Sequence, residues 1–129
     1  MKITICGSMK FYEQYVKLKN ELENLGHEVI VPLPDENYSV HLNIKRKAME
    51  DFNENLKKSD AILVANYDKE DKICHIGINS IMEIGMAFNQ GKKIFILNKM
   101  PNDCGEELIA IDAVELNGDL NKLKESDLE

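Results

Sequence analysis

The chain has 129 residues, the length of a single domain, and its 23 acidic against 16 basic residues give a formal net charge of −7. That charge excludes long-range attraction to a nucleic acid polymer or an anionic membrane, so a small molecule is the expected ligand. No apolar run approaches the ~20 residues that span a bilayer, and the three cysteines lack CxxC spacing and cannot all pair. We therefore expect one soluble, cytoplasmic domain over residues 1–129.

The first half of the chain alternates apolar strands with amphipathic helices. Residues 2–6 predict a strand, and residues 11–25 predict a helix because their apolar side chains recur at three- and four-residue spacing. Residues 27–32 predict the second strand of a right-handed β-α-β unit. The turn-rich segment 33–42 is a candidate mobile lid, and the apolar spacing over 43–58 predicts a second helix.

The second half continues the alternation from a short buried strand at 60–66. A loop ending at Ser80 precedes a helix that runs to about Gln90 and carries Glu83 in its first turn. We then expect a strand at 92–97, a short helical turn at 106–109, a weak strand at 113–116 and a docked or frayed tail at 117–129.

This order of elements, with near-continuous apolar strands, predicts an α/β fold: a flavodoxin-like (Rossmann-like) five-stranded parallel sheet with helices on both faces. Such sheets bind ligands at the carboxyl ends of their strands. Two strand ends carry suitable residues, one running into Gly7 and the other leading to the helix of Glu83. These two segments therefore mark the expected site.

The Gly7-Ser8-Met9 turn combines backbone N–H groups, a hydroxyl and a helix start, which together suit a phosphate or hydroxyl group. It lacks the further glycines and the Lys-Ser/Thr pair of a P-loop or dinucleotide fingerprint. An ordinary turn with Ser8 as the N-cap is an equally good interpretation. Lys10 either adds a cationic contact to an anion or is solvated.

Glu83 also has two interpretations. Ser80-Ile81-Met82-Glu83 spells a capping box, in which the carboxylate bonds back to the N–H of the cap residue. Alternatively, a carboxylate kept ionised and oriented by a helix N-terminus is suited to act as the nucleophile of glycosyl transfer.

Other acidic residues offer a partner for such a nucleophile. The helix before the third strand carries three acidic residues, Asp51, Glu50 and Glu54. They either form its solvent-exposed face, or one of them points to the site and supplies the proton-transfer group. Asp60 falls at the amino end of that strand, where we expect a structural role. The adjacent Cys74 and His75 lack the second ligand cluster that a metal site needs, so we predict no metal.

Three segments, Ile5–Met9, Ser59–Val64 and Ile76–Ala87, resemble the nucleoside 2-deoxyribosyltransferase-like family, which includes the transferases and the 2′-deoxynucleoside 5′-phosphate N-hydrolases. The similarity extends over about residues 2–98. Its most specific part is the Glu-x-Gly-x-Ala pattern at Glu83, Gly85 and Ala87.

The resemblance implies a flavodoxin-like fold, a homodimer or higher homo-oligomer, and catalysis without a cofactor. It implies that Glu83 attacks the anomeric carbon and displaces the base, with Asp51 as the acid/base and Glu50 as the other candidate. It also implies a phosphate seat and substrate contacts from residues of the two marked segments. These are Gly7, Ser8, Met9, Lys10 (where an arginine often stands), Asn79 and Ser80.

The favoured hypothesis is an N-glycosidase that hydrolyses the base–sugar bond of a (deoxy)nucleoside 5′-monophosphate. The first alternative is a nucleoside 2-deoxyribosyltransferase that exchanges bases. The second is a nucleotide-binding sensor without turnover. A panel of nucleosides and 5′-monophosphates, with and without an acceptor base, distinguishes the three.

Overall fold

The computed structural model describes residues 1–32, 42–69 and 71–123 of the chain. The candidate lid at 33–42, with Tyr38 and His41, therefore lies outside the described residues except for Leu42. So do the last six residues of the predicted tail. Within the described residues, no helix has the length and apolar character to cross a membrane.

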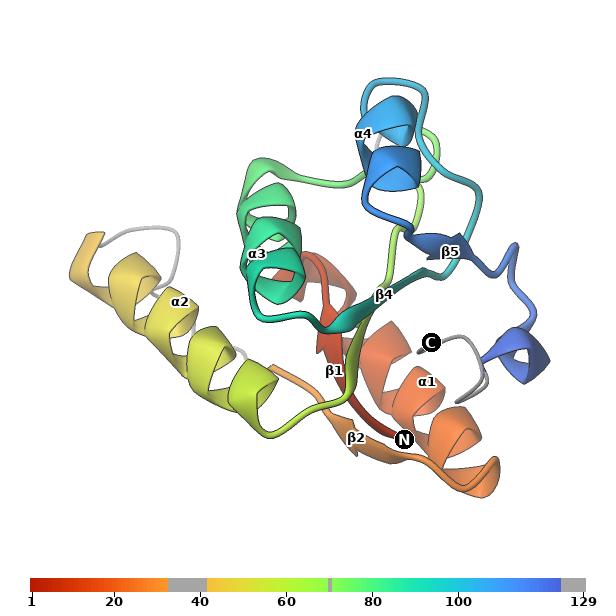
Figure 1. Cartoon of the computed structure of the whole chain (residues 1–129), viewed down its shortest axis with the longest axis horizontal. Coiled ribbons are helices and arrows are strands. Elements are labelled where there is room, and N and C mark those ends of the chain that lie inside the picture. Colours follow the sequence, from red (N-terminus) through yellow and green to blue (C-terminus); the bar gives the residue numbers. More distant parts are fainter. Residues whose placement is uncertain (33–41, 70, 124–129) are drawn as a thin grey trace.

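The five strands form one parallel sheet in the order β2-β1-β3-β4-β5, which confirms the predicted flavodoxin-like architecture (Figure 1). Cys6 pairs with Val64, and Val64 pairs with Ile96, so the central strands end in register at one edge. The strand bounds are β1 (Lys2–Cys6), β2 (Glu28–Ile30), β3 (Ala61–Val64), β4 (Lys93–Ile96) and β5 (Val114–Glu115).

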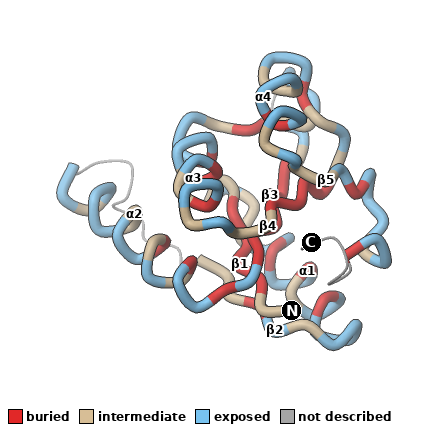
Figure 2. The backbone as a smooth tube through the Cα atoms, viewed as in Figure 1, coloured by how far each residue is buried: buried red, intermediate tan, exposed pale blue. Residues whose placement is uncertain are grey.

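Helices cover both faces of the sheet, also as predicted. One core cluster joins the sheet to α1, and the other joins it to α2, α3 and α4; Figure 2 shows the buried residues concentrated on the strands between these layers. The helices are η1 (Met9–Phe11), α1 (Tyr12–Asn24), α2 (Leu42–Lys57), α3 (Ile78–Asn89), α4 (Gly105–Ala110) and η2 (Leu120–Lys122).

Residues of β1 alternate between the two faces, because successive side chains of a strand point in opposite directions. Ile3 and Ile5 pack in the cluster on the α1 side, whereas Cys6 packs in the cluster with α2 and α3. Thr4 lies on the same face as Cys6 and is fully buried, and its hydroxyl is hydrogen bonded to that of Ser59 at 2.7 Å. The last residue of β1 therefore faces α3.

Asp60 has the structural role expected of it. Its carboxylate accepts a hydrogen bond from the backbone N–H of Lys2 at 2.8 Å, and its own N–H donates to the Lys2 carbonyl at 2.7 Å. These bonds join the amino ends of β1 and β3, at the edge opposite to the expected site.

Asn66 joins two loops at the carboxyl edge. Its side-chain amide donates to the carbonyls of Cys74 at 3.3 Å and Lys99 at 2.8 Å, and its Oδ1 accepts the N–H of Asn98 at 2.9 Å. The residue is 1% exposed. One buried side chain thus fixes the loops that follow β3 and β4.

The turn after β1 is held by Tyr15 of α1. The Tyr15 side chain is fully buried, and its hydroxyl donates to the carbonyl of Ser8 at 2.6 Å. A Cβ on residue 7 would overlap that hydroxyl and crowd the Ala65 carbonyl, so only glycine allows this approach. Gly7 is therefore needed for the close packing between the turn and α1.

We expect Gly7→Ala to lower the free energy of unfolding by about 1–3 kcal/mol through overpacking. Tyr15→Phe removes the overlapping oxygen, so the double variant should lose less than the sum of the two single variants. Urea denaturation of all four proteins measures this coupling. Gly85→Ala is the matched control, since a Cβ there meets nothing within 4 Å and should raise stability by up to about 1 kcal/mol. Strict additivity at Gly7 and Tyr15 would contradict this account of the turn.

Candidate active site

The helix that carries Glu83 begins earlier than the sequence predicts. α3 starts at Ile78 with Gly77 as its N-cap, and the Ile81 N–H donates to the Gly77 carbonyl at 3.0 Å. Ser80 is the third residue of the helix and is buried, so the predicted capping box is wrong. The helix includes Ser80 because Ser80, Ile84 and Ala87 share one face, and burying that face stabilises the helix more than a Ser80 cap would. Glu83 therefore lies in the second turn and caps nothing.

The Glu83 carboxylate instead meets the end of β1. The Cys6 thiol donates to Glu83 Oε1 at 3.3 Å and also lies 4.0 Å from the Ser80 carbonyl oxygen. Cys6 is 1% exposed, and Glu83 is partly buried. The two residues are 77 positions apart in sequence, and the parallel sheet brings them together.

Burial dominates the electrostatics of this pair. It raises the pKa of Glu83 from an ordinary 4.5 to about 7, although the hydrogen bond from Cys6 acts in the opposite direction. The expectation that a helix start keeps Glu83 ionised is therefore wrong, because the residue lies beyond the first turn and is buried. Burial, followed by the nearby carboxylate, raises the pKa of the Cys6 thiol well above its usual value, so that thiol is a proton donor at neutral pH.

The Gly7-Ser8-Met9 turn follows Cys6 directly. Ser8 is the N-cap of η1, and its hydroxyl accepts the Lys10 N–H at 3.3 Å, as the simpler interpretation predicts. Among the described residues, none accepts the backbone N–H groups of Ser8 or Met9. These two donors lie beside the cap, at a helix start, which is where backbone N–H groups can bind an anion.

The acidic residues of α2 are solvent-exposed. Asp51 forms an ion pair with Lys47 at 3.2 Å, and Glu50 forms one with Arg46 at 3.7 Å. Both acids line a pocket between α2 and α3, together with Met86, which lies one turn beyond Glu83. None of the described contacts joins either acid to Glu83. The proton-transfer role of Asp51, or of Glu50, stays a prediction.

The remaining predicted residues divide between the surface and the interior. Lys10 and Asn79 are exposed and have no described contact to Glu83, whereas Ser80 is buried next to Cys6. The structure therefore brings Glu83, Ser80 and the start of the Gly-Ser turn together around Cys6. In the described part of the chain, no group of three or more His, Cys, Asp or Glu residues is placed to hold a metal ion.

Sequence reasoning missed two residues of this region. In the sequence, Cys6 is only the last residue of a predicted strand, and Tyr15 is only one apolar position of a predicted helix. A cysteine as the last residue of a strand, directly before a Gly-Ser turn, is the signal that was available for the first. No local pattern indicates the second, because its hydroxyl partner lies outside α1.

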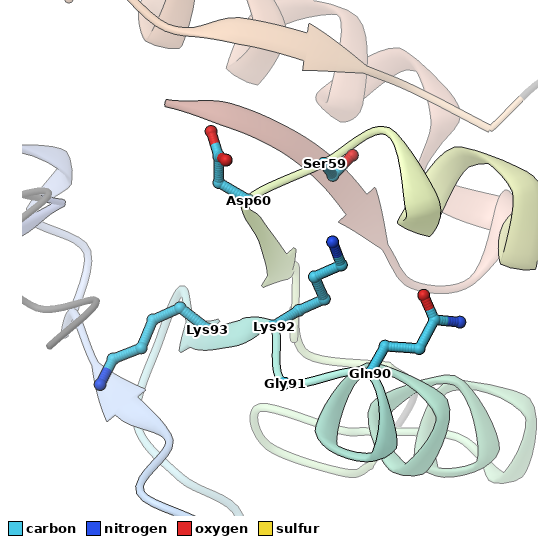
Figure 3. Close-up of a pocket in the computed structure, with 6 residues that line it drawn as sticks. All are labelled: Ser59, Asp60, Gln90, Gly91, Lys92 and Lys93. Atoms are coloured by element: carbon cyan, nitrogen blue, oxygen red, sulfur yellow. The ribbon is translucent and has the colours of Figure 1, made fainter.

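A second pocket lies at the opposite edge of the sheet, around the starts of β3 and β4 (Figure 3). Three of its polar side chains have structural partners: Ser59 bonds to Thr4 and to the Asn55 carbonyl, Asp60 accepts the Lys2 N–H, and Gln90 donates to Asn53. Parallel sheets bind their ligands at the carboxyl edge, so the region around Glu83 remains the candidate active site.

No family model and no curated protein sequence matches the chain. Two solved structures resemble it. One is a 2-deoxyribosyltransferase from Bacillus psychrosaccharolyticus, with 17% identity, a TM-score of 0.66, and coverage of 99% of this chain and 96% of that one. The other is a CMP N-glycosidase from Clostridium botulinum, with 18% identity, a TM-score of 0.59, and coverage of 89% and 87%. At these identities the comparison shows a shared fold over nearly the whole chain.

Proposed function

We propose that this protein is an N-glycosidase that cleaves the base–sugar bond of a (deoxy)nucleoside 5′-monophosphate, with Glu83 as the nucleophile. The observation that carries the proposal is a partly buried carboxylate that caps nothing and meets the thiol before an anion-suited turn. The two proteins of similar fold, a 2-deoxyribosyltransferase and a CMP N-glycosidase, support the same class of chemistry.

The mechanism has two steps. The ionised Glu83 carboxylate attacks the anomeric carbon, the C–N bond breaks, and the base leaves with a proton from an acid. Water then attacks the anomeric carbon of the glycosyl ester, which releases the sugar phosphate and regenerates Glu83. Asp51 is our candidate for the acid/base, and Glu50 is the alternative. Both lie on α2, which packs beside α3.

A phosphate on the substrate fits the turn after β1. The N–H groups of Ser8 and Met9, for which the described residues supply no acceptor, offer the donors, and the start of a helix favours negative charge. Gly7 lets the turn pack tightly against α1, which fixes these donors in place. A transferase would use the same Glu83 ester but resolve it with a second base. The resemblance to a 2-deoxyribosyltransferase over 99% of the chain keeps that alternative open.

A homo-oligomer, implied by the family resemblance, is part of the proposal. α3 supports it with exposed apolar side chains in the helix that bears Glu83, of the kind that subunit interfaces bury. They are Ile78, Ile81, Met82 and Phe88.

The decisive experiment incubates the protein with nucleosides and 5′-monophosphates, with and without an acceptor base, and measures free base and new nucleoside by chromatography. We expect base release from a 5′-monophosphate without an acceptor, and loss of this activity by about 10³-fold or more in Glu83→Gln. The variant should stay folded because Glu83 caps nothing. Glu13→Gln, on the exposed face of α1, is the matched control.

Exchange of bases without hydrolysis would replace the glycosidase by the transferase. Tight nucleotide binding without base release would favour the sensor. Full activity in Glu83→Gln would disprove the nucleophile.

The pH dependence of the reaction follows from the raised pKa of Glu83. Only the ionised carboxylate attacks, so the ascending limb of kcat/KM against pH should have a midpoint near 7, and the rate should fall again at higher pH where the acid that protonates the leaving base is itself ionised. Stability should change in the opposite direction. Between about pH 4.5 and 7 the folded protein binds more protons at Glu83 than the unfolded chain does, so the free energy of unfolding falls as pH rises.

Denaturant titrations of wild type and Glu83→Gln at pH 5 and pH 8 isolate this effect. The stability of the wild type relative to the variant should be about 1–3 kcal/mol lower at pH 8 than at pH 5. An equal difference at both pH values would contradict the raised pKa.

A further inference from the structure

We propose that Cys6 is a positioning residue for Glu83: its thiol donates a hydrogen bond to Oε1 and holds the carboxylate in place for attack on the sugar. The inference rests on the proposed function, because positioning matters only if Glu83 reacts. The hydrogen bond itself is observed, at 3.3 Å between Sγ and Oε1.

The thiol is held more rigidly than a loop donor would be. Cys6 ends the central strand β1, which pairs with β2 on one side and with β3 on the other, where Cys6 itself is in register with Val64. Its side chain is 1% exposed and packs among residues of the sheet, α2 and α3. A donor on a strand between two others keeps its position when a ligand enters, which is the requirement for pre-organised chemistry.

The thiol has two acceptors within reach, and both belong to α3. The Glu83 oxygen lies at 3.3 Å and the Ser80 carbonyl oxygen at 4.0 Å. A single S–H bonds to the nearer acceptor, the more strongly so when that acceptor carries charge. When Oε2 is bonded to the sugar, Oε1 becomes the uncharged carbonyl oxygen of the ester and a weaker acceptor, and the Ser80 carbonyl is the alternative acceptor for the thiol.

The second carboxylate oxygen is available for reaction. Among the described residues, none donates to Oε2 of Glu83, and no buried polar side-chain atom lacks a partner. Oε2 is therefore the carboxylate oxygen that the proposal assigns to the attack. The two carboxylate oxygens thus have different roles: Oε1 accepts the hydrogen bond from Cys6 on the sheet, and Oε2 attacks the sugar.

Among the described residues, Cys6 is the hydrogen-bond donor to Glu83. The other polar groups nearby are the Tyr15 hydroxyl of α1 and the Ser80 carbonyl of α3. The Tyr15 hydroxyl donates to the Ser8 carbonyl instead, and the Ser80 carbonyl is itself an acceptor. Tyr15 interacts with Glu83 only through space. The acids of α2 pair with cations on their own helix. Removal of the thiol therefore leaves the ionised carboxylate without a described donor.

The first test measures the ionisation of Glu83 directly, without any substrate. Side-chain ¹³C NMR titrations of wild type, Cys6→Ala and Cys6→Ser follow the Glu83 carboxyl signal, which is assigned by its absence in Glu83→Gln. We expect the Glu83 pKa to rise by about half a pH unit or more in Cys6→Ala, because a bond to the charged form is lost. Cys6→Ser keeps a donor and should leave the pKa at or below the wild-type value. Identical titrations in all three proteins would overturn the proposal.

The second test measures base release from a 5′-monophosphate. We expect kcat to fall about tenfold in Cys6→Ala with little change in KM, the ascending limb of the pH profile to move upward, and Cys6→Ser to restore most of the rate. Cys104→Ala, at the N-cap residue of α4, where no described contact reaches Glu83, is the matched control and should behave as wild type. If Cys6→Ala does not fold, the serine variant carries the test, and loss of the rate there would count against the proposal.

The two tests separate the possible failures. If the wild type releases base and Cys6→Ala does so at an unchanged rate and pH optimum, Cys6 does not position Glu83, while the proposed function stands. If the NMR shifts occur but the wild type releases no base, the proposed function fails and the positioning role fails with it.

Discussion

The two-residue alternation of β1 is the constraint on which the site depends. Ile3 and Ile5 face α1, so Thr4 and Cys6 face the opposite side of the sheet, where both are buried and a polar side chain needs a protein partner. These two side chains of β1 have such partners: Thr4 bonds to Ser59 near the amino edge, and Cys6 bonds to Glu83 at the carboxyl edge. A shift of β1 by one residue would bury Ile5 in place of the thiol and remove the partner of Glu83.

The two carboxylates of the proposed mechanism lie in contrasting surroundings. Glu83 is partly buried between α3 and the end of β1, its described hydrogen-bond donor is the Cys6 thiol, and burial raises its pKa to about 7. Asp51 is solvated on α2 and paired with Lys47. Enzymes that use two acids commonly give them such different environments, because one must be poised to change protonation near neutral pH. A substrate seated between α2 and α3 would alter the solvation of both groups.

The sequence predicted the strand order, the helices on both faces and the role of Asp60, because buried parallel strands leave a continuous apolar signal and their amino and carboxyl ends follow from chain direction. The predicted start of α3 is wrong because the capping signal at Ser80 depends only on neighbouring residues. The burial of Ser80 and Ile84 depends instead on how the helix packs against the rest of the core. The Cys6–Glu83 bond could not be predicted for a related reason. It joins residues 77 positions apart, and no periodicity relates them.

Asn66 has a consequence for how this scaffold can change over evolution. Because a single amide binds the segments around Cys74 and Lys99, the loops after β3 and β4 share one anchor at their base. Insertions in the outer parts of these loops can alter the shape of the carboxyl edge of the sheet without shifting the strands. Substitution of Asn66 itself would release both loops at once. Diversification of ligand preference in this scaffold should therefore proceed through the loop tips, while the amide at their root is retained.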